Sequence, residues 1–128
     1  MLTDFYGNHL TTNTGLARDS YDIGLRAFLS ANYGALEAFS QAVEADPNFA
    51  LAYLGLARAF MSSGQISEAK LALKKAKNLL VGVTDREKSH FLCCELILLG
   101  EAKKAKEAVQ THVSEWPRDA MVAQMSTS

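Results

Sequence analysis

The sequence predicts an all-α protein, a solenoid of about three helical hairpins followed by a short C-terminal helix. Three observations lead to this prediction. A small–large–small pattern of apolar residues recurs along the chain at a spacing of 34 to 36 residues, a second apolar helical pattern precedes it, and glycine separates the two. One helix–turn–helix unit repeated at this period is typical of arrays in which each hairpin packs on the next.

The repeat becomes visible when the chain is compared with itself at a fixed spacing. The small–large–small pattern has three copies, the second 34 and the third a further 36 residues along: Ala35, Phe39 and Ala42; Ala69, Leu73 and Ala76; Ala105, Val109 and His112. The other half of the unit returns after 36 residues, with Leu56, Ala57 and Phe60 repeated as Leu92, Cys93 and Leu96. The two extra residues fall in the predicted loop 81–84, where an insertion costs little free energy.

Each element follows from local signals. The expected helices lie near 17–30, 35–45, 49–62, 66–80, 85–98 and 102–115, with a stub from about 119. Thr84 and Glu87 form the sequence pattern of a capping box, which predicts the start of the fifth helix. Gly64 and Gly100 follow first helices of hairpins, where left-handed backbone is needed. The expected organisation is an N-terminal extension and a repeat domain: 1–16, and 17–128 with units of about 17–48, 49–83 and 84–118 and a stub at 119–128.

The second unit resembles the tetratricopeptide repeat, a 34-residue helix–turn–helix motif. The matching positions are Tyr53, Leu56, Ala57, Phe60, Ala69, Leu73 and Ala76. Two positions depart from the motif, since Val81 stands where a proline is usual and His112 where a small residue is usual. The resemblance implies a right-handed α-solenoid that binds a protein or peptide on its concave face, is not an enzyme and needs no cofactor.

A narrower resemblance rests on four short motifs. They are Asp4-x2-Gly-Asn, Asp46-Pro-x-Phe-Ala, Arg86-Glu-x2-His and Pro117-Arg-Asp-Ala. Together these motifs look like the start of the thirty-eight-type tetratricopeptide repeat proteins. This resemblance implies an alternative role, in which the chain is an architectural or oligomerisation element, the N-terminal part of a longer repeat array.

In the family, the first helices of the hairpins line the concave face, so their residues that are not used for packing are the ligand-binding candidates. These are Tyr21, Leu25 and Phe28 in the first unit, Leu51, Leu54, Arg58 and Met61 in the second, and His90, Cys94 and Ile97 in the third. The alternative is that these side chains cover core edges or pack on a flanking segment. Glu87 and Phe91 stand where family members that clamp a terminal carboxylate have Lys and Arg, which argues against an acidic chaperone tail as the ligand.

His90 and Cys94 share a helical face at positions i and i+4, which makes them candidates for a metal or catalytic site. A zinc site needs three or four ligands, and no others converge on this pair in the sequence. A catalytic Cys–His pair would need a third orienting group and an oxyanion hole, and the sequence shows neither. We therefore expect no metal and no catalytic residue.

The C-terminal end predicts a self-association surface. The sixth predicted helix is followed by only nine residues after Asp119, too few to cover its apolar face fully. Uncovered ends of repeat arrays tend to associate, most often as two-fold dimers. The expected interface of a homodimer consists of Val109, Val113, Trp116, Met121, Val122 and Met125.

Charge and composition exclude several partner classes. The net charge is -1, from 13 Lys and Arg against 14 Asp and Glu, which gives no field to gather nucleic acid or an anionic membrane. The N-terminal residues 1–15 lack the pattern of a signal peptide, and no apolar stretch is long enough to span a bilayer, so we expect a cytoplasmic protein. The adjacent Cys93 and Cys94 are expected to stay reduced.

Overall fold

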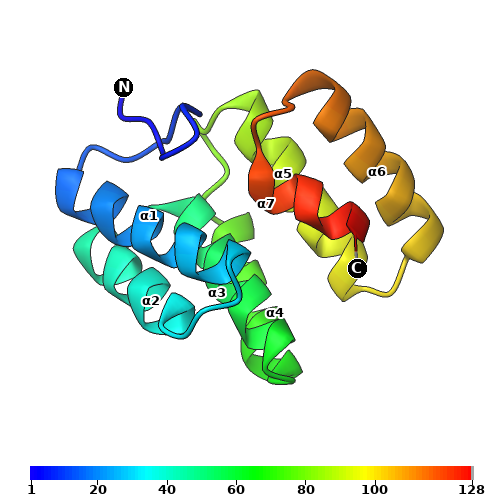
Figure 1. Ribbon diagram of the computed structural model, residues 1–128, viewed down its shortest axis with the longest axis horizontal. Coiled ribbons are helices and arrows are strands. Elements are labelled where there is room, and N and C mark those ends of the chain that lie inside the picture. The colour runs from blue at the N-terminus through cyan, green and yellow to red at the C-terminus, as the bar shows by residue number, and fades with distance from the viewer. Residues whose placement is uncertain (128) are drawn as a thin grey trace.

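The computed structural model describes residues 1–127 and shows an array of three helical hairpins (Figure 1). The hairpins pair α1 (Gly15–Leu29) with α2 (Ala35–Ala45), α3 (Ala50–Ser62) with α4 (Ile66–Lys77), and α5 (Asp85–Leu98) with α6 (Ala102–Glu115). A short α7 (Ala120–Ala123) and a 3-10 turn η1 (Gln124–Thr127) follow. The predicted all-α class is confirmed, and each of the six long helices lies within three residues of its expected bounds. Ser128, the last residue of the expected stub, lies outside the described residues.

The predicted helix boundaries have the expected local causes. The Thr84 hydroxyl accepts a hydrogen bond from the Glu87 amide, and the Glu87 carboxylate accepts one from the Thr84 amide at 3.0 Å, so the capping box is present. Gly64 and Gly100 have φ of 77° and 75° just after α3 and α5. A residue with a side chain rarely adopts this conformation, so glycine ends both helices.

The core of the first two hairpins is built around the ring of Phe39. Its ring centroid lies 5.6 Å from that of Tyr21, whose ring in turn lies 5.3 Å from Phe49. All three rings are buried, and they join α1 and α2 to the start of the second hairpin. Burying three aromatic side chains in one cluster contributes several kcal/mol, about 1.5–3 for each ring.

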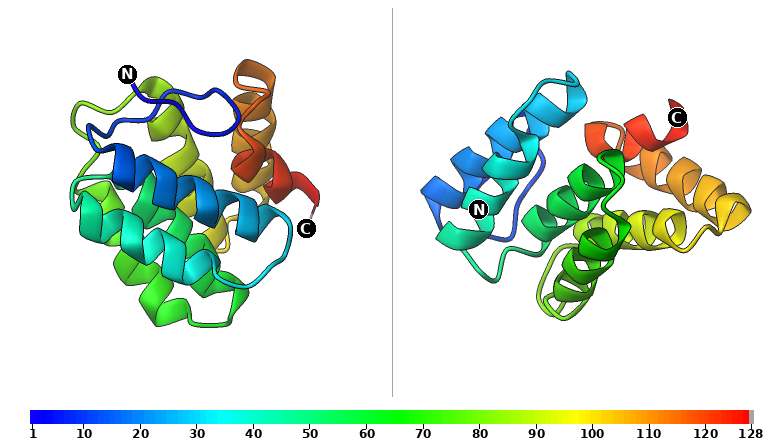
Figure 2. Two further views of the ribbon diagram at one scale, coloured as in Figure 1. Left: turned by 60° about the vertical axis from the view of Figure 1, so that its left-hand side comes forward. Right: turned by 90° about the horizontal axis from the view of Figure 1, so that it is seen from below.

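The segment before α1 is an ordered loop that crosses the array (dark blue in Figure 2). It starts with an isolated antiparallel bridge between Thr3 and His9. The Asn8 side chain then donates to the backbone carbonyl of Arg118, at 2.9 Å, across a sequence separation of 110 residues. The N-terminal segment therefore connects the first hairpin directly to the end of the third.

The C-terminal segment formed by α7 and η1 packs against α6 and lies between α3 and α6 in Figure 1. Arg58 of α3 holds it there, because its Nη1 donates to the Met121 carbonyl at 2.8 Å and its Nη2 to the Gln124 side-chain oxygen at 2.9 Å. α7 also contacts α1. The inner surface formed by α1, α3 and α5 is thus partly covered by the chain itself.

Candidate functional site

The structure divides the predicted concave-face residues into two groups. The first group is at most 2% exposed and lies in the interior: Tyr21, Leu25, Leu51, Leu54, His90 and Cys94. These six were expected to face a ligand, and the structure shows them buried instead, five of them in the apolar core and His90 beside Asp119. They pack as core residues, which is the alternative that the sequence left open.

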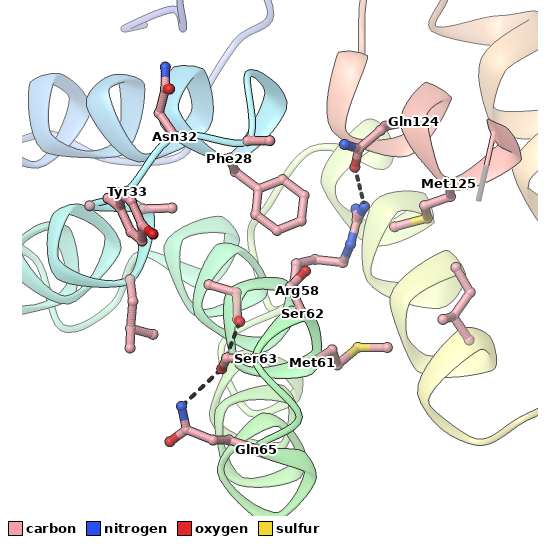
Figure 3. Close-up of a pocket in the computed structure, with 16 residues that line it drawn as sticks. Phe28, Asn32, Tyr33, Arg58, Met61, Ser62, Ser63, Gln65, Gln124 and Met125 are labelled. Atoms are coloured by element: carbon pink, nitrogen blue, oxygen red, sulfur yellow. Dashed lines mark hydrogen bonds between the residues drawn. The ribbon is translucent and has the colours of Figure 1, made fainter.

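The second group lines a groove of 830 Å³ (Figure 3). Phe28 of α1, Arg58 and Met61 of α3 and Ile97 of α5 all border it, although they come from three different hairpins. Met125 of η1 forms part of the opposite wall. The structure therefore brings together four of the ten predicted residues, and it adds a wall from the C-terminal segment that sequence reasoning did not assign to this site.

The rest of the groove is formed by the loop that joins α1 to α2, the first residues of α2, the end of α3 with the turn after it, and Gln124 of η1. The lining residues there are Ala31, Asn32, Tyr33, Gly34, Ala35, Leu36, Ala59, Ser62, Ser63, Gln65 and Gln124. Tyr33 is fully exposed at the rim. The lining contains no Asp or Glu, and Arg58 is its single ionisable side chain apart from Tyr33. The arrangement suits a largely apolar ligand that approaches from solvent.

A buried polar cluster joins α5, α6 and the start of α7, and the sequence did not predict it. Its centre is Asp119, whose Oδ2 accepts a hydrogen bond from Arg86 Nη1 at 2.8 Å and lies 2.9 Å from His112 Nε2. The Nδ1 of His90 lies 3.3 Å from the same oxygen without hydrogen-bond geometry, so neither ring nitrogen of His90 has a partner within the described chain. All four side chains are buried. Three sequence features could have indicated this cluster: the motifs Arg86-Glu-x2-His and Pro117-Arg-Asp-Ala, and His112 at a position where a small residue is usual.

The charges of the cluster shift its pKa values. Burial by itself would raise the pKa of the Asp119 carboxyl, but His90, His112 and Arg86 outweigh burial and hold it well below the usual range. Burial lowers the pKa of the His90 imidazole, and Arg86 and Arg58 add to this lowering against the attraction of Asp119. Asp119 is therefore ionised and His90 neutral near pH 7.

Ser89, His112 and Asp119 form a chain of contacts that resembles a catalytic triad. Ser89 Oγ lies 2.7 Å from His112 Nδ1, and His112 Nε2 lies 2.9 Å from Asp119 Oδ2. The roles of the two ring nitrogens are reversed relative to the usual triad. Ser89 also lies inside α5, where helical hydrogen bonds occupy the backbone amides that would have to stabilise an oxyanion. The arrangement therefore orients His112 toward Asp119 rather than activating Ser89.

The same cluster extends to the N-terminal segment. Arg86 Nη2 donates to the His9 carbonyl at 2.9 Å, and the Thr11 amide donates to Glu87 Oε2 at 3.1 Å. Because these contacts join the N-terminal segment to α5, and Asp119 joins α5 to α6 and α7, the cluster serves as a structural junction. Within residues 1–127, no three His, Cys, Asp or Glu side chains are grouped so as to hold a metal ion.

The predicted dimer interface is also corrected. Val109, Met121, Val122 and Met125 are buried within the chain, while Val113 and Trp116 are partly exposed. The reason is that α7 turns inward onto the array, so its apolar side chains pack in the core, and Trp116 packs against His112 with ring centroids 5.0 Å apart. Most of the apolar surface expected at this end is therefore closed within one molecule.

Three stacked hairpins with a groove on the inner side define a helical repeat protein. Residues 34–80, which run from the start of α2 through α4, match the family model described as tetratricopeptide repeat. This match agrees with the tetratricopeptide resemblance that the second unit carries in its sequence. No curated protein and no solved structure matches the chain. In the part of the chain that the structure describes, the helices are too short or too polar to span a membrane.

Proposed function

We propose that the chain is a non-enzymatic scaffold that binds a protein or peptide partner in the groove bordered by Phe28, Arg58, Met61 and Ile97. Tetratricopeptide repeats suggest a protein-interaction role, and the match to this family supports one here. The observation that carries the proposal is the groove itself, because it is open to solvent, largely apolar and bordered by three concave-face residues, Phe28, Met61 and Ile97, that stay partly exposed. Concave apolar surfaces of this size are where proteins place ligands.

The proposal includes a cytoplasmic location and excludes nucleic acid and membrane surfaces as partners. A net charge of -1 supports both exclusions, since phosphate-binding surfaces are strongly basic. The proposal needs no cofactor or metal, because shape and apolar contact are sufficient for peptide binding.

A random peptide display selection on the folded chain tests this proposal. Met61→Glu places a charge on the apolar floor of the groove, and Leu71→Glu is the matched control because Leu71 is 64% exposed on α4 and does not line the groove. We expect enriched peptides to bind the wild type and the control and to lose binding to the Met61 variant. Peptides that bind all three proteins equally, or a selection without enrichment, would contradict the proposal.

An architectural or oligomerisation role is the second candidate, and one surface favours it. Leu16, Ile23 and Phe5 are each more than half exposed on α1 and the segment beside it. Such a face is suited to contact with another helical unit or with a second copy of the chain. Sedimentation equilibrium of the wild type and of Ile23→Glu tests it, and a chain that stays monomeric at hundreds of micromolar would exclude self-association through this face.

A further inference from the structure

We infer that the partner segment bound in this groove presents an acidic side chain to Arg58, flanked by apolar residues. This inference rests on the proposed function and specifies the chemistry of the ligand. The two buried arginines, Arg58 and Arg86, differ in whether an acidic side chain balances their charge.

These two side chains are almost equally buried, at 8% and 6% exposed, but only one has a counter-ion. Arg86 pairs with Asp119 at 2.8 Å. Arg58, within the described chain, donates to the neutral oxygens of Met121 and Gln124 and forms no ion pair. A buried cation without an anion is costly, and an incoming carboxylate would compensate its charge.

The position of Arg58 makes its charge available to a ligand. Its guanidinium carbon lies 5.0 Å from the centroid of the Phe28 ring, and both side chains border the groove (Figure 3). Arginine carries five N–H donors in a rigid plane; two of them bond to the C-terminal segment, and the Cys94 thiol also interacts with this guanidinium. The remaining donors and the ring of Phe28 together provide adjacent positions for a carboxylate and an apolar side chain.

The surface around Arg58 carries further positive charge. A second hollow of 550 Å³ continues from the groove, because Ile97 and Met125 line both. Its lining contains Lys106 and no Asp or Glu. The two linings therefore carry two cations and no anion, although acidic residues outnumber basic ones in the whole chain. An acidic ligand is the electrostatic complement of this surface.

The continuity of the two hollows also indicates how the carboxylate is presented. A segment that follows the surface past Ile97 and Met125 extends to both sides of Arg58, so the anion comes from a side chain within the segment rather than from a chain terminus. We therefore propose an internal Asp or Glu as the group that contacts Arg58.

Synthetic decapeptides with blocked ends test the inference by fluorescence anisotropy. Each set shares the same Leu, Phe and Ser flanks and differs at one central position, which is Glu, Gln or Lys. We expect Glu peptides to bind the wild type at least about tenfold more tightly than their Gln twins, because a charge-assisted hydrogen bond is roughly twice as strong as a neutral one. A further arm combines the Gln peptide with a free C-terminal carboxylate, and stronger binding of that peptide than of the Glu peptide would overturn the internal side chain as the source.

Two variants locate the effect at Arg58. Arg58→Gln should abolish the preference for Glu, but it also removes donors to Met121 and can weaken the fold. Ser62→Glu avoids this problem, because exposed Ser62 lines the groove one helical turn after Arg58 and leaves the arginine in place. We expect Ser62→Glu to remove the preference and Ser62→Gln to keep it.

The outcomes separate this inference from the proposed function. If the wild type binds the Glu and Gln peptides with equal affinity, and Met61→Glu abolishes that binding, the scaffold function stands and the preference for an acidic ligand is refuted. A set in which no peptide binds in a Met61-dependent way would contradict both. A preference for Glu that persists unchanged in Ser62→Glu and in folded Arg58→Gln would refute the assignment to Arg58.

Discussion

The ring of Phe39 lies directly against the backbone of Gly55. A Cβ atom at position 55 would lie 2.6 Å from Phe39 Cδ1, and one at Gly24, on the neighbouring helix α1, would lie 2.7 Å from the same atom. Real Cβ atoms do not approach other heavy atoms this closely. The two glycines therefore let α1 and α3 approach one buried ring, and α2 is fixed between them.

Gly55→Ala is expected to lower the free energy of unfolding by about 1–3 kcal/mol, because the added methyl group forces the Phe39 ring or a helix to move. The sign of this change distinguishes close packing from an ordinary helix position, because Gly→Ala inside an unconstrained helix raises the free energy of unfolding by roughly 1 kcal/mol. Gly15→Ala is the control, as a Cβ there meets nothing within 4 Å. Urea unfolding followed by circular dichroism measures both, and a stabilised Gly55 variant would contradict the packing.

Ala57→Leu and Ala76→Leu test the small residues of the repeat. Both alanines are fully buried, so the larger side chain overpacks the contact although it stays apolar and helical. We expect each variant to lose about 1–3 kcal/mol of stability. Thermal melts followed by circular dichroism are suitable, and unchanged midpoints for both variants would show that the helices are not closely packed at these positions.

Asp119→Asn should be among the most destabilising single substitutions in the chain. It leaves the charge of Arg86 buried without a partner, and breaking a buried ion pair in this way costs about 3–5 kcal/mol. Asp19→Asn is the matched control, because Asp19 pairs with Arg18 on the surface and such pairs contribute about 0–1 kcal/mol. Similar losses in the two variants, measured by urea unfolding, would disprove the central role of Asp119.

The pH dependence of stability follows from His90 and Asp119. Burial lowers the pKa of folded His90 below its ordinary value of 6.5, so the unfolded chain takes up the proton first. This contribution is complete above about pH 6.5 and is lost as the pH falls from there toward the folded pKa. The pKa of Asp119 is held below its ordinary 3.8 against the effect of burial, by His90, His112 and Arg86, so its contribution is lost only in stronger acid.

We therefore expect the free energy of unfolding to fall between pH 7.5 and 5 by about 1.4 kcal/mol for each unit of His90 shift that the range covers. His90→Met should flatten this part of the profile. His9→Gln should leave it unchanged, because the His9 side chain is exposed and only its backbone carbonyl contacts Arg86. A profile with the same slope in wild type and His90→Met would assign the pH dependence to other groups.

The cysteines are expected to resist a thiol reagent in the folded chain. Burial raises the pKa of the Cys93 thiol to about 11 and that of Cys94 to about 12, so neither is a thiolate at pH 7.5. The sequence-based expectation that Cys94 faces a ligand implied faster reaction at Cys94, and its burial argues against this. Mass spectrometry after brief alkylation should find both modified only in denaturant, and selective native labelling of Cys94 would restore the earlier assignment.

The repeat made the helices predictable, because Ala57, Ala76 and the capping residue Thr84 act within a few turns of their own positions. The site was only partly predictable. Leu51 and Leu54 are buried in a core that also contains Met121 and Val122 of the C-terminal segment, more than sixty positions away. Periodicity along one helix carries no information on which distant segment covers it. The ion pair of Asp119 with Arg86 was not predictable for the same reason, because the two residues are 33 positions apart and neither belongs to the repeat pattern.

The contact between Thr11 and Glu87 joins two positions that are 76 residues apart in the sequence. A simple solenoid gains and loses hairpins one at a time, since each interacts only with its neighbours. Here a hairpin inserted between α2 and α5 would separate the two ends that the N-terminal segment joins, and the Asn8 bond to Arg118 would be lost as well. Contacts between the N-terminal segment and the third hairpin raise the mean sequence separation of contacting residues, which slows folding. They also favour all-or-none unfolding over unfolding that proceeds from one end.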